Sequence, residues 1–281
     1  MSRARIASLH LYPVKGVRGI ALDAARVEAT GLAHGGVADR EWMVVDPDGR
    51  FVTQREMPRL ALVVPSVAQD ALVLSTDGRD PLHVELGRRP AAARDVVVWR
   101  SHVRGHDEGD DAAAWLSSHL AHDVRLVRFD RSKRRLCNRE FAGDSGAHTF
   151  FADGYPVLVI GSASLADLNQ RLAGKGEAAL PMNRFRPSVV IDGLEPYDED
   201  HVDTLAVGEL TLKLVKPCAR CQVTTTDQLT AKVGIEPLPT LATYRHHATM
   251  DGVMFGVNAI VTRGAGTTVG TGAGVDVAYR F

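Results

Sequence analysis

The sequence predicts a mainly β protein with a few short helices. Through the first hundred residues, short apolar alternations are interrupted by turn residues, which is typical of antiparallel β structure. In the second half, apolar and β-branched runs predict further strands, and only segments 112–120 and 164–172 indicate helices. Strands are therefore expected to dominate both halves.

Seven strands are expected in the first hundred residues. They span 6–12, 41–45, 51–54, 60–64, 71–74, 82–86 and 95–99. Asp46-Pro47-Asp48-Gly49 predicts a tight turn, because proline presets φ and glycine accepts a positive φ. Residues 112–120 predict a short helix that Asp110 or Asp111 can cap. We place a domain boundary after this helix, which divides the chain into 1–122 and 123–281.

The second part begins with a strand near 124–129 and a loop of about twenty residues, a length that is usually functional or mobile. A helix is expected over 164–172, with Ser164 and Asp167 in capping-box spacing and Gly174 beyond its end. The other expected strands are 156–160, 188–191, 210–215, 222–226 and a glycine-broken segment from residue 253.

Composition excludes several classes of protein. The 281 residues are 45% hydrophobic and 24% charged, as in soluble globular proteins. With 33 basic against 34 acidic residues, no global field attracts nucleic acid or an anionic membrane, so neither is an expected partner. No apolar stretch reaches 18 residues, and the first residues run into an expected strand, so we expect a cytoplasmic protein.

The pair Cys218-Ala219-Arg220-Cys221 is the local motif with the clearest chemical potential, and three interpretations compete for it. A zinc site needs four ligands, but the remaining candidates are Cys137 and two distant histidines. A redox pair normally opens a helix, whereas a β-branched run follows Cys221. The third interpretation is that both thiols are buried as small apolar groups.

The position of the pair favours a metal ligand. It follows Pro217 at an expected strand end, with Lys216 and Arg220 close in sequence. Positive charge stabilises a thiolate, and a thiolate suits a metal that prefers soft sulfur donors.

Several separated motifs together identify a family resemblance. They are Tyr12-Pro13-Val14-Lys15-Gly16, Asp39-Arg40-Glu41-Trp42, Met182-Asn183-Arg184-Phe185-Arg186-Pro187, the stretch from Cys218 to Asp227, Glu236-Pro237-Leu238-Pro239-Thr240-Leu241 with Tyr244-Arg245, and Phe255-Gly256-Val257-Asn258. In this order and spacing they resemble the MOSC family, the molybdenum cofactor sulfurase C-terminal domain. The similar branch has an N-terminal β-barrel domain and includes the mitochondrial amidoxime-reducing component. The resemblance covers essentially the whole chain and implies two barrel-like domains that meet around a molybdenum cofactor (Mo-molybdopterin).

The resemblance also implies site residues. Cys221 corresponds to the catalytic cysteine that ligates molybdenum, whereas Cys218 is not a ligand in the family. The residues implied to bind the cofactor are Lys15, Gly16, Arg40, Asp153, Gly154, Tyr155, Arg186, Ser188, Arg220 and Asn258. Arg186 corresponds to the arginine that contacts the pterin phosphate, which agrees with the preference of phosphate for guanidinium donors.

Some positions depart from the family pattern. Ser188 stands where relatives often have asparagine, and Thr226-Asp227-Gln228 replaces the usual Val-Asp-Pro. The first change replaces an amide by a hydroxyl with fewer hydrogen-bonding groups. Cys137 has no family counterpart, and we expect it to face solvent.

The implied reaction is the reduction of N-hydroxylated compounds such as amidoximes, hydroxylamines and hydroxylated nucleobases. Two electrons remove one oxygen as water at molybdenum, with Asp227 and His148 as candidate proton donors. Three dispersed cysteines cannot hold a Cys₄ iron–sulfur cluster, so a separate reductase or ferredoxin must supply the electrons. Two alternatives stay open: a non-catalytic carrier of the cofactor or of sulfur, and a cofactor-free β scaffold in which the cysteines are packed.

Overall fold

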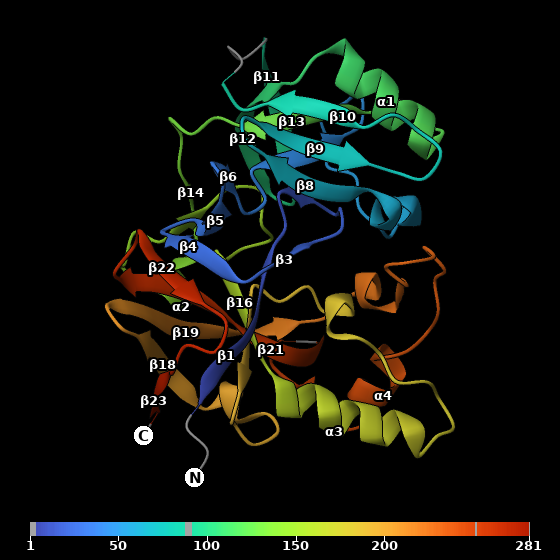
Figure 1. The fold of residues 1–281 in the computed structure, drawn as a ribbon. Helices are drawn as coiled ribbons and strands as arrows, with labels where there is room; N and C mark the ends of the chain where they lie inside the picture. Colours follow the sequence, from blue (N-terminus) through green and yellow to red (C-terminus); the bar gives the residue numbers. More distant parts are fainter. Residues whose placement is uncertain (1–3, 88–91, 251, 281) are drawn as a thin grey trace.

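The computed structural model describes residues 4–87, 92–250 and 252–280, and it confirms a mainly β fold with a few short helices (Figure 1). The strands are β1 (Arg5–Leu11), β2 (Val14–Lys15), β3 (Ile20–Leu22), β4 (Ala24–Glu28), β5 (Gly31–His34), β6 (Val37–Ala38), β7 (Trp42–Val45), β8 (Val64–Ala68), β9 (Ala71–Ser75), β10 (Leu82–Glu85), β11 (Ala93–Val98), β12 (Ser101–Asp107), β13 (Arg125–Phe129), β14 (Arg135–Leu136), β15 (His148–Thr149), β16 (Val157–Gly161), β17 (Val189–Asp192), β18 (Val202–Val207), β19 (Leu210–Ala219), β20 (His246–His247), β21 (Gly252–Arg263), β22 (Thr267–Gly270) and β23 (Asp276–Tyr279). The α-helices are α1 (Asp110–Leu120), α2 (Arg139–Ala142), α3 (Ser162–Ala173) and α4 (Leu238–Ala242), and the 3-10 helices are η1 (Pro58–Leu62), η2 (Met182–Arg184), η3 (Asp198–Asp200) and η4 (Gln222–Thr225).

The sheets exchange strands between the two halves of the sequence. The largest runs β23-β18-β19-β21-β16-β17-β1-β3, with β20 paired to β21, so two N-terminal strands complete a C-terminal sheet. A five-stranded sheet runs β11-β12-β13-β7-β2, and β22 pairs with β4 in a four-stranded sheet. The boundary after residue 122 therefore stays a prediction, because β13 and β22 join N-terminal strands. The strand pairs of the described residues form open sheets, in place of the closed barrels that the resemblance implied.

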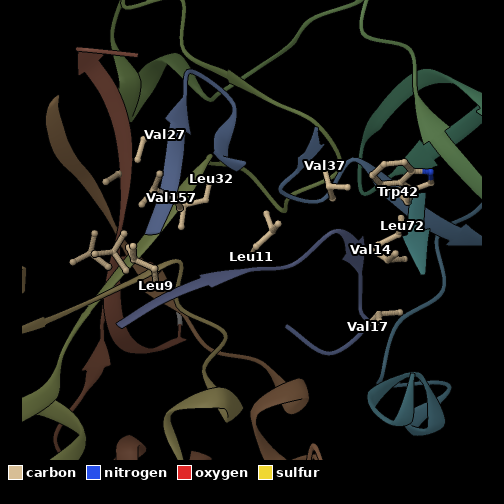
Figure 2. Close-up of a cluster of buried hydrophobic side chains, with 14 of the residues drawn as sticks. Leu9, Leu11, Val14, Val17, Val27, Leu32, Val37, Trp42, Leu72 and Val157 are labelled. Carbon is tan, nitrogen blue, oxygen red and sulfur yellow. The ribbon is translucent and has the colours of Figure 1, made fainter. Parts of the chain in front are cut away.

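One buried apolar cluster runs through both halves. Leu9 and Leu11, on strand β1 of the largest sheet, belong to this cluster, and Val14, Trp42 and Leu72 continue it into the N-terminal sheets (Figure 2). All five side chains are fully buried, and each such burial contributes about 1.5–3 kcal/mol. The two halves are therefore joined by a continuous core, which fixes the relative positions of surfaces contributed by each.

Most predicted strands are confirmed within a few residues, but three are wrong. Segment 51–54 forms only an isolated bridge between Phe51 and Val45. Segment 60–64 is mostly the 3-10 helix η1, which Pro58 begins. Segment 222–226 is mostly η4, because the hydroxyls of Thr224 and Thr225 donate to carbonyls three residues earlier, at 2.9 and 2.8 Å. These local bonds offset the strand preference of β-branched residues.

The predicted N-terminal caps of both helices are wrong, whereas Gly174 does lie just beyond α3, as its C-cap. Gly109 occupies the N-cap of α1, while the two aspartates lie in its first turn, where a carboxylate is favourable to the helix dipole. The Ser164 hydroxyl lies inside α3 and donates to Glu199 at 2.7 Å instead of capping the helix. The long loop after β13 contains β14, α2 and β15. No helix of the described residues has the length and hydropathy needed to cross a bilayer.

Gly31 is a point of close approach between the halves. Its φ is +122°, and a Cβ placed there would lie 2.6 Å from the carbonyl oxygen of Pro156. We expect Gly31→Ala to lower the free energy of unfolding by about 2 kcal/mol or more, since backbone strain and a clash add. Gly78 has a φ of +72° with open space around it. Gly78→Ala is therefore a control that measures the cost of backbone strain alone. Equal losses in denaturant unfolding of the two variants would show that the contact with Pro156 is unimportant.

Candidate functional site

A single pocket gathers the eleven residues predicted to bind the cofactor or the metal. With its open mouth included it encloses about 950 Å³. Its lining contains all eleven predicted residues, namely Lys15, Gly16, Arg40, Asp153, Gly154, Tyr155, Arg186, Ser188, Arg220, Cys221 and Asn258. The N-terminal wall consists of Lys15 in β2, Gly16, Arg40 two residues before β7, residues of segment 51–55 and Trp99, and the segments around β16, β17, β19 and β21 supply the other wall. The pocket therefore lies where the two halves of the chain meet.

The pocket is strongly cationic. Its charged lining consists of five cations against one carboxylate, and the five are Lys15, Arg40, Arg55, Arg186 and Arg220. The carboxylate is that of Asp153, so the lining has a formal charge of +4 in a chain of net charge −1. Such local clustering is what recognition of an anion requires in a nearly neutral protein.

Two arginines flank the buried ring of Tyr12. The Cζ atoms of Arg40 and Arg186 lie 4.3 and 4.4 Å from the ring centroid, and both residues have positive φ, +48° and +55°. Arg40 forms an ion pair with the buried carboxylate of Asp39. Arg186 donates to the carbonyl of Val17 at 2.6 Å and has no carboxylate partner among the described residues. The Arg186 guanidinium is therefore available to bind an anion.

The pKa of Arg186 reflects this shortage of negative charge. Burial and the neighbouring Arg40 lower it to about 10. The unpaired positive charge is therefore unfavourable in the protein alone. An anion bound beside the guanidinium would stabilise its positive charge and raise the pKa of Arg186.

Lys15 is held differently. Its ammonium is bound to the carboxylate of Asp153 and lies 5.1 Å from the centroid of the Phe51 ring. Trp99 Nε1 donates to the same carboxylate oxygen at 2.9 Å. Burial acts to raise the pKa of Asp153, but Lys15 and Trp99 outweigh it and the pKa falls below its ordinary value. Asp153 therefore stays ionised and holds the Lys15 ammonium at the pocket wall.

The cysteine pair lies where β19 passes into η4. Cys221 is exposed in the pocket wall, which argues against plain burial of both thiols. Arg220 directs Nη1 to Cys218 Sγ at 2.9 Å and Nη2 to the carbonyl of Phe185 at 2.6 Å. Lys216 lies over the ring of Phe141, outside the pocket lining. Both cations thus have contacts of their own, and only Arg220 lines the same pocket as Cys221, so stabilisation of the Cys221 thiolate by these charges stays a prediction.

Two competing interpretations of the pair can be judged from the geometry. Within the described residues, no group of three or more His, Cys, Asp or Glu side chains is placed to hold a metal, which argues against a zinc site. The argument against a redox pair from a following strand fails, because Cys221 is the N-cap residue of η4.

Cys137 is buried, so the expectation that it faces solvent is wrong. It packs against Tyr155 and Ile260, and burial raises the pKa of its thiol to about 11. The β14–β15 pairing folds this segment over the apolar cluster. A thiol with this pKa is a poor nucleophile.

The remaining predicted residues have structural contacts as well. Ser188 Oγ accepts a hydrogen bond from the Leu158 backbone at 3.2 Å, linking β16 to the start of β17. Asn258 Nδ2 donates to the Lys216 carbonyl at 3.2 Å, across β19 and β21. The buried hydroxyl of Tyr155 has no hydrogen-bond partner among the described residues. These residues line the pocket while also bracing its walls.

Comparisons with known proteins agree with this geometry. The family model described as MOSC N-terminal beta barrel domain matches residues 3–123, and the MOSC domain model matches residues 146–275. The chain is 37% identical over 245 residues to mitochondrial amidoxime reducing component 2 of Bos taurus, covering 85% of this chain and 72% of that protein. The chain belongs to the MOSC family. It is also 36% identical over 246 residues to mitochondrial amidoxime-reducing component 1 of Homo sapiens, with the same coverage of both chains.

Within this MOSC chain, several pocket residues were missed by sequence reasoning. They are Phe51, Thr53, Gln54, Arg55, Trp99, Ala152, Pro156, Leu158, Phe185, Cys218, Ala219, Val223 and Thr224. Most are apolar or neutral. Five of them, namely Phe185, Cys218, Ala219, Val223 and Thr224, lie within the family motifs but carry no chemistry that marked them as pocket residues. The guanidinium of Arg55 and the indole of Trp99 are the side chains whose type could have indicated a binding role.

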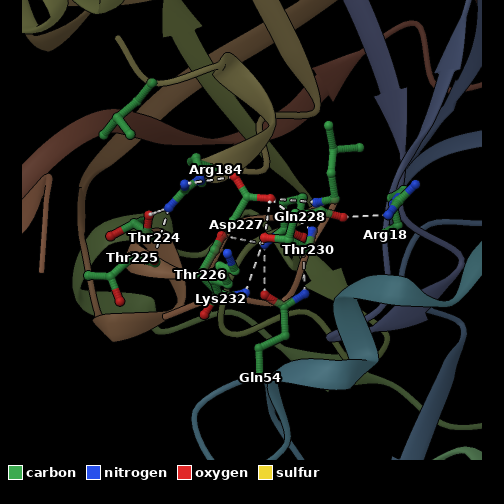
Figure 3. Close-up of polar contacts among 12 residues, drawn as sticks. Arg18, Gln54, Arg184, Thr224, Thr225, Thr226, Asp227, Gln228, Thr230 and Lys232 are labelled. Atoms are coloured by element: carbon green, nitrogen blue, oxygen red, sulfur yellow. Dashed lines mark hydrogen bonds and ion pairs between the residues drawn. The ribbon is translucent and has the colours of Figure 1, made fainter. Parts of the chain in front are cut away.

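Gln54 belongs to a clasp between the two MOSC segments (Figure 3). Its Nε2 donates to Gln228 Oε1 at 3.1 Å, and Gln228 Nε2 returns a bond to Gln54 Oε1 at 2.9 Å. Gln54 Nε2 also donates to the carbonyl of Gly16 at 2.7 Å. Both amides are buried, so the clasp fixes the pocket wall at Gly16 against the loop after η4.

The two candidate proton donors do not line the pocket. Asp227 forms an ion pair with Arg184 at 3.0 Å and accepts bonds from the backbones of Leu229 and Thr230. His148 contacts the carbonyl of Gly146 at 3.3 Å. Their contacts indicate structural roles.

Proposed function

We propose that this MOSC protein binds a molybdenum cofactor and reduces N-hydroxylated compounds, including amidoximes, hydroxylamines and hydroxylated nucleobases. The observation that carries the proposal is the convergence of an exposed thiol with a cationic pocket at the junction of the two MOSC segments. Relatives at 36–37% identity are named for amidoxime reduction. The chain thus belongs to a molybdenum-cofactor-associated reductase family.

The residues present fit a phosphate-bearing pterin. Arg186 lacks a carboxylate partner, and the buried Nε of Arg220 has no hydrogen-bond partner among the described residues. Guanidinium groups of this kind bind phosphate in bidentate fashion. Cys221 offers one soft donor, which suits a metal whose other ligands come from the cofactor itself.

In the proposed reaction, the chain's own residues would bind and orient the cofactor. Arg186 and Arg40 hold the phosphate, while the Cys221 thiolate holds the metal. The bound cofactor supplies the two-electron chemistry that removes the substrate oxygen as water. Because the sequence has no flavin, nicotinamide or iron–sulfur motif, we propose a separate reductase or ferredoxin as electron donor. We also propose a cytoplasmic location.

The proposal is tested by activity of protein made in a host that synthesises the cofactor. With a reduced viologen dye as donor, conversion of benzamidoxime to benzamidine is expected. Protein from a host strain that lacks cofactor synthesis should show none. Cofactor bound at near-stoichiometric amounts without turnover of any N-hydroxylated compound would instead favour the carrier alternative.

Arg186→Gln is expected to weaken cofactor retention about tenfold to a hundredfold, as loss of a charge-assisted hydrogen bond implies. The apo variant should be no less stable than the apo wild type, because the Arg186 guanidinium lies beside that of Arg40 across the Tyr12 ring and has no carboxylate partner among the described residues. Molybdenum content after gel filtration and thermal unfolding of the apo protein measure the two effects. Arg139→Gln, at an exposed ion pair outside the pocket, is the matched control. Unchanged retention in Arg186→Gln would remove this residue from the phosphate site.

A further inference from the structure

Trp99 is an exposed aromatic residue in the wall of the pocket. Its side chain lies in the turn between β11 and β12 and the residue is 47% exposed. Its φ is +55°, which is uncommon for a bulky residue and costs on the order of 1–3 kcal/mol. A large apolar ring held exposed in a strained turn suggests a role beyond folding.

Three contacts hold the ring in place. The indole Nε1 donates to the Asp153 carboxylate at 2.9 Å, and the Phe51 ring meets the indole edge-on with centroids 5.0 Å apart. The guanidinium of Arg55 lies 4.9 Å from the indole centroid. Arg55 Nε in turn donates to Thr53 Oγ1 at 3.3 Å, which orients the guanidinium. The ring is therefore fixed from its edge and from one side, and still contributes exposed surface to the pocket.

The ring and the proposed metal ligand come from opposite halves of the chain. Trp99, Phe51 and Arg55 belong to the N-terminal segment, whereas Cys221 belongs to the C-terminal segment, and all four line the same pocket. A substrate bound between these walls can reach Cys221 while one of its faces lies on the indole. The large flat indole ring can stack on conjugated groups, and its fixed orientation reduces the entropy that binding costs.

We propose that Trp99, supported by Arg55 and Phe51, is a stacking platform that makes the pocket prefer planar conjugated substrates over aliphatic ones. This inference rests on the proposed function and adds a specificity-determining residue to it. In an aryl amidoxime the ring and the N-hydroxylated group are conjugated, so the whole molecule can lie flat on the indole. In an alkyl amidoxime only the small functional group can do so.

The test measures binding as well as turnover. Benzamidoxime and acetamidoxime are titrated by calorimetry into protein from a cofactor-competent host, with molybdenum content determined on each sample. The variants are Trp99→Leu, which keeps apolar bulk, Trp99→Phe, which keeps a smaller ring, and Trp115→Leu, a control on α1 outside the pocket. Wild type should prefer benzamidoxime. Trp99→Leu should weaken benzamidoxime binding about tenfold with acetamidoxime nearly unchanged, Trp99→Phe should retain most of the preference, and Trp115→Leu all of it.

The possible results separate this inference from the proposed function. An equal preference in wild type and Trp99→Leu overturns the platform, as does a wild type that shows no preference. Loss of molybdenum in Trp99→Leu also overturns it, because the ring would then be a cofactor contact. If the binding preference depends on Trp99 but no sample turns over either amidoxime, the platform stands and the reductase proposal fails. Where turnover occurs, Trp99→Leu should raise KM for benzamidoxime with little change in kcat.

Discussion

Replacing Cys221 with serine is expected to remove nearly all molybdenum from protein made in a cofactor-competent host. A serine hydroxyl stays protonated near neutral pH and is a hard donor, so it cannot replace a thiolate on a metal that prefers sulfur. Cys221 is exposed in the pocket wall, where it is free to act as a ligand. Inductively coupled plasma mass spectrometry of the purified proteins measures the loss.

Cys218→Ser is the matched control, since the two cysteines share a chain segment and differ in contacts. Cys218 contacts the Arg220 guanidinium at 2.9 Å and packs against the apolar cluster of Phe185 and Phe255. We expect this variant to retain most of its molybdenum. Equal loss from both variants would indicate damage to the segment and not removal of a ligand. Retention in Cys221→Ser would eliminate Cys221 as the ligand.

The fold was predictable where strands have apolar runs or regular apolar alternation between turn residues. Strands such as β9 and β16 carry apolar runs bounded by turn residues, and both are confirmed. The wrong strand predictions include a segment where local side-chain hydrogen bonds to the backbone outweigh the strand propensity of β-branched residues. Thr224 and Thr225 form η4 because their hydroxyls bond back to the chain, and such bonds cannot be read from β-branched residues alone.

The pocket was predictable to the extent that its residues carry family motifs. The structure brings all eleven of those residues to one pocket, although it does not test their binding. Residues that depend on tertiary contact were not predictable. Gln54 and Gln228 pair across 174 positions, and neither lies in a pattern that identifies its partner. Trp99 becomes notable only when its exposure, its φ and its contact with Asp153 are seen together.

Repulsion among the cations of the pocket lowers the stability of the fold, and the neighbouring carboxylates offset this repulsion. Asp39 forms an ion pair with Arg40, and its other oxygen accepts the Tyr12 backbone N–H at 2.9 Å. Asp153 plays the same part for Lys15. Arg186 has no such partner among the described residues, and burial together with Arg40 lowers its pKa to about 10. Burial lowers the pKa of Lys15 as well, although Asp153 acts against this shift. The protein thus stabilises two of these cations internally and leaves the third available to a ligand.

Glu41→Ala is expected to cause the largest loss of stability, about 3 kcal/mol. Glu41 is fully buried and accepts bonds from Arg128 Nε at 2.7 Å, Arg131 Nη2 at 2.5 Å and the Ala38 backbone at 3.2 Å. Its removal leaves two guanidinium groups without their carboxylate, and breaking a buried pair in this way costs about 3–5 kcal/mol. We choose the lower end because both arginines are partly exposed. Urea unfolding of the apo protein measures the change.

The loss should extend to the pocket, because Glu41 follows Arg40 directly. Arg40 keeps a positive φ through backbone bonds to Tyr12 at 2.7 Å and to Phe151 at 2.9 Å, and Glu41 anchors the chain on its C-terminal side. Glu41→Ala should therefore lower molybdenum retention as well as stability. Asp144→Asn breaks an exposed ion pair with Arg139 and should cost less than about 1 kcal/mol, with retention unchanged. A Glu41→Ala protein as stable as Asp144→Asn would mean that Arg128 and Arg131 find other partners, and the Arg40 backbone would then need a different anchor.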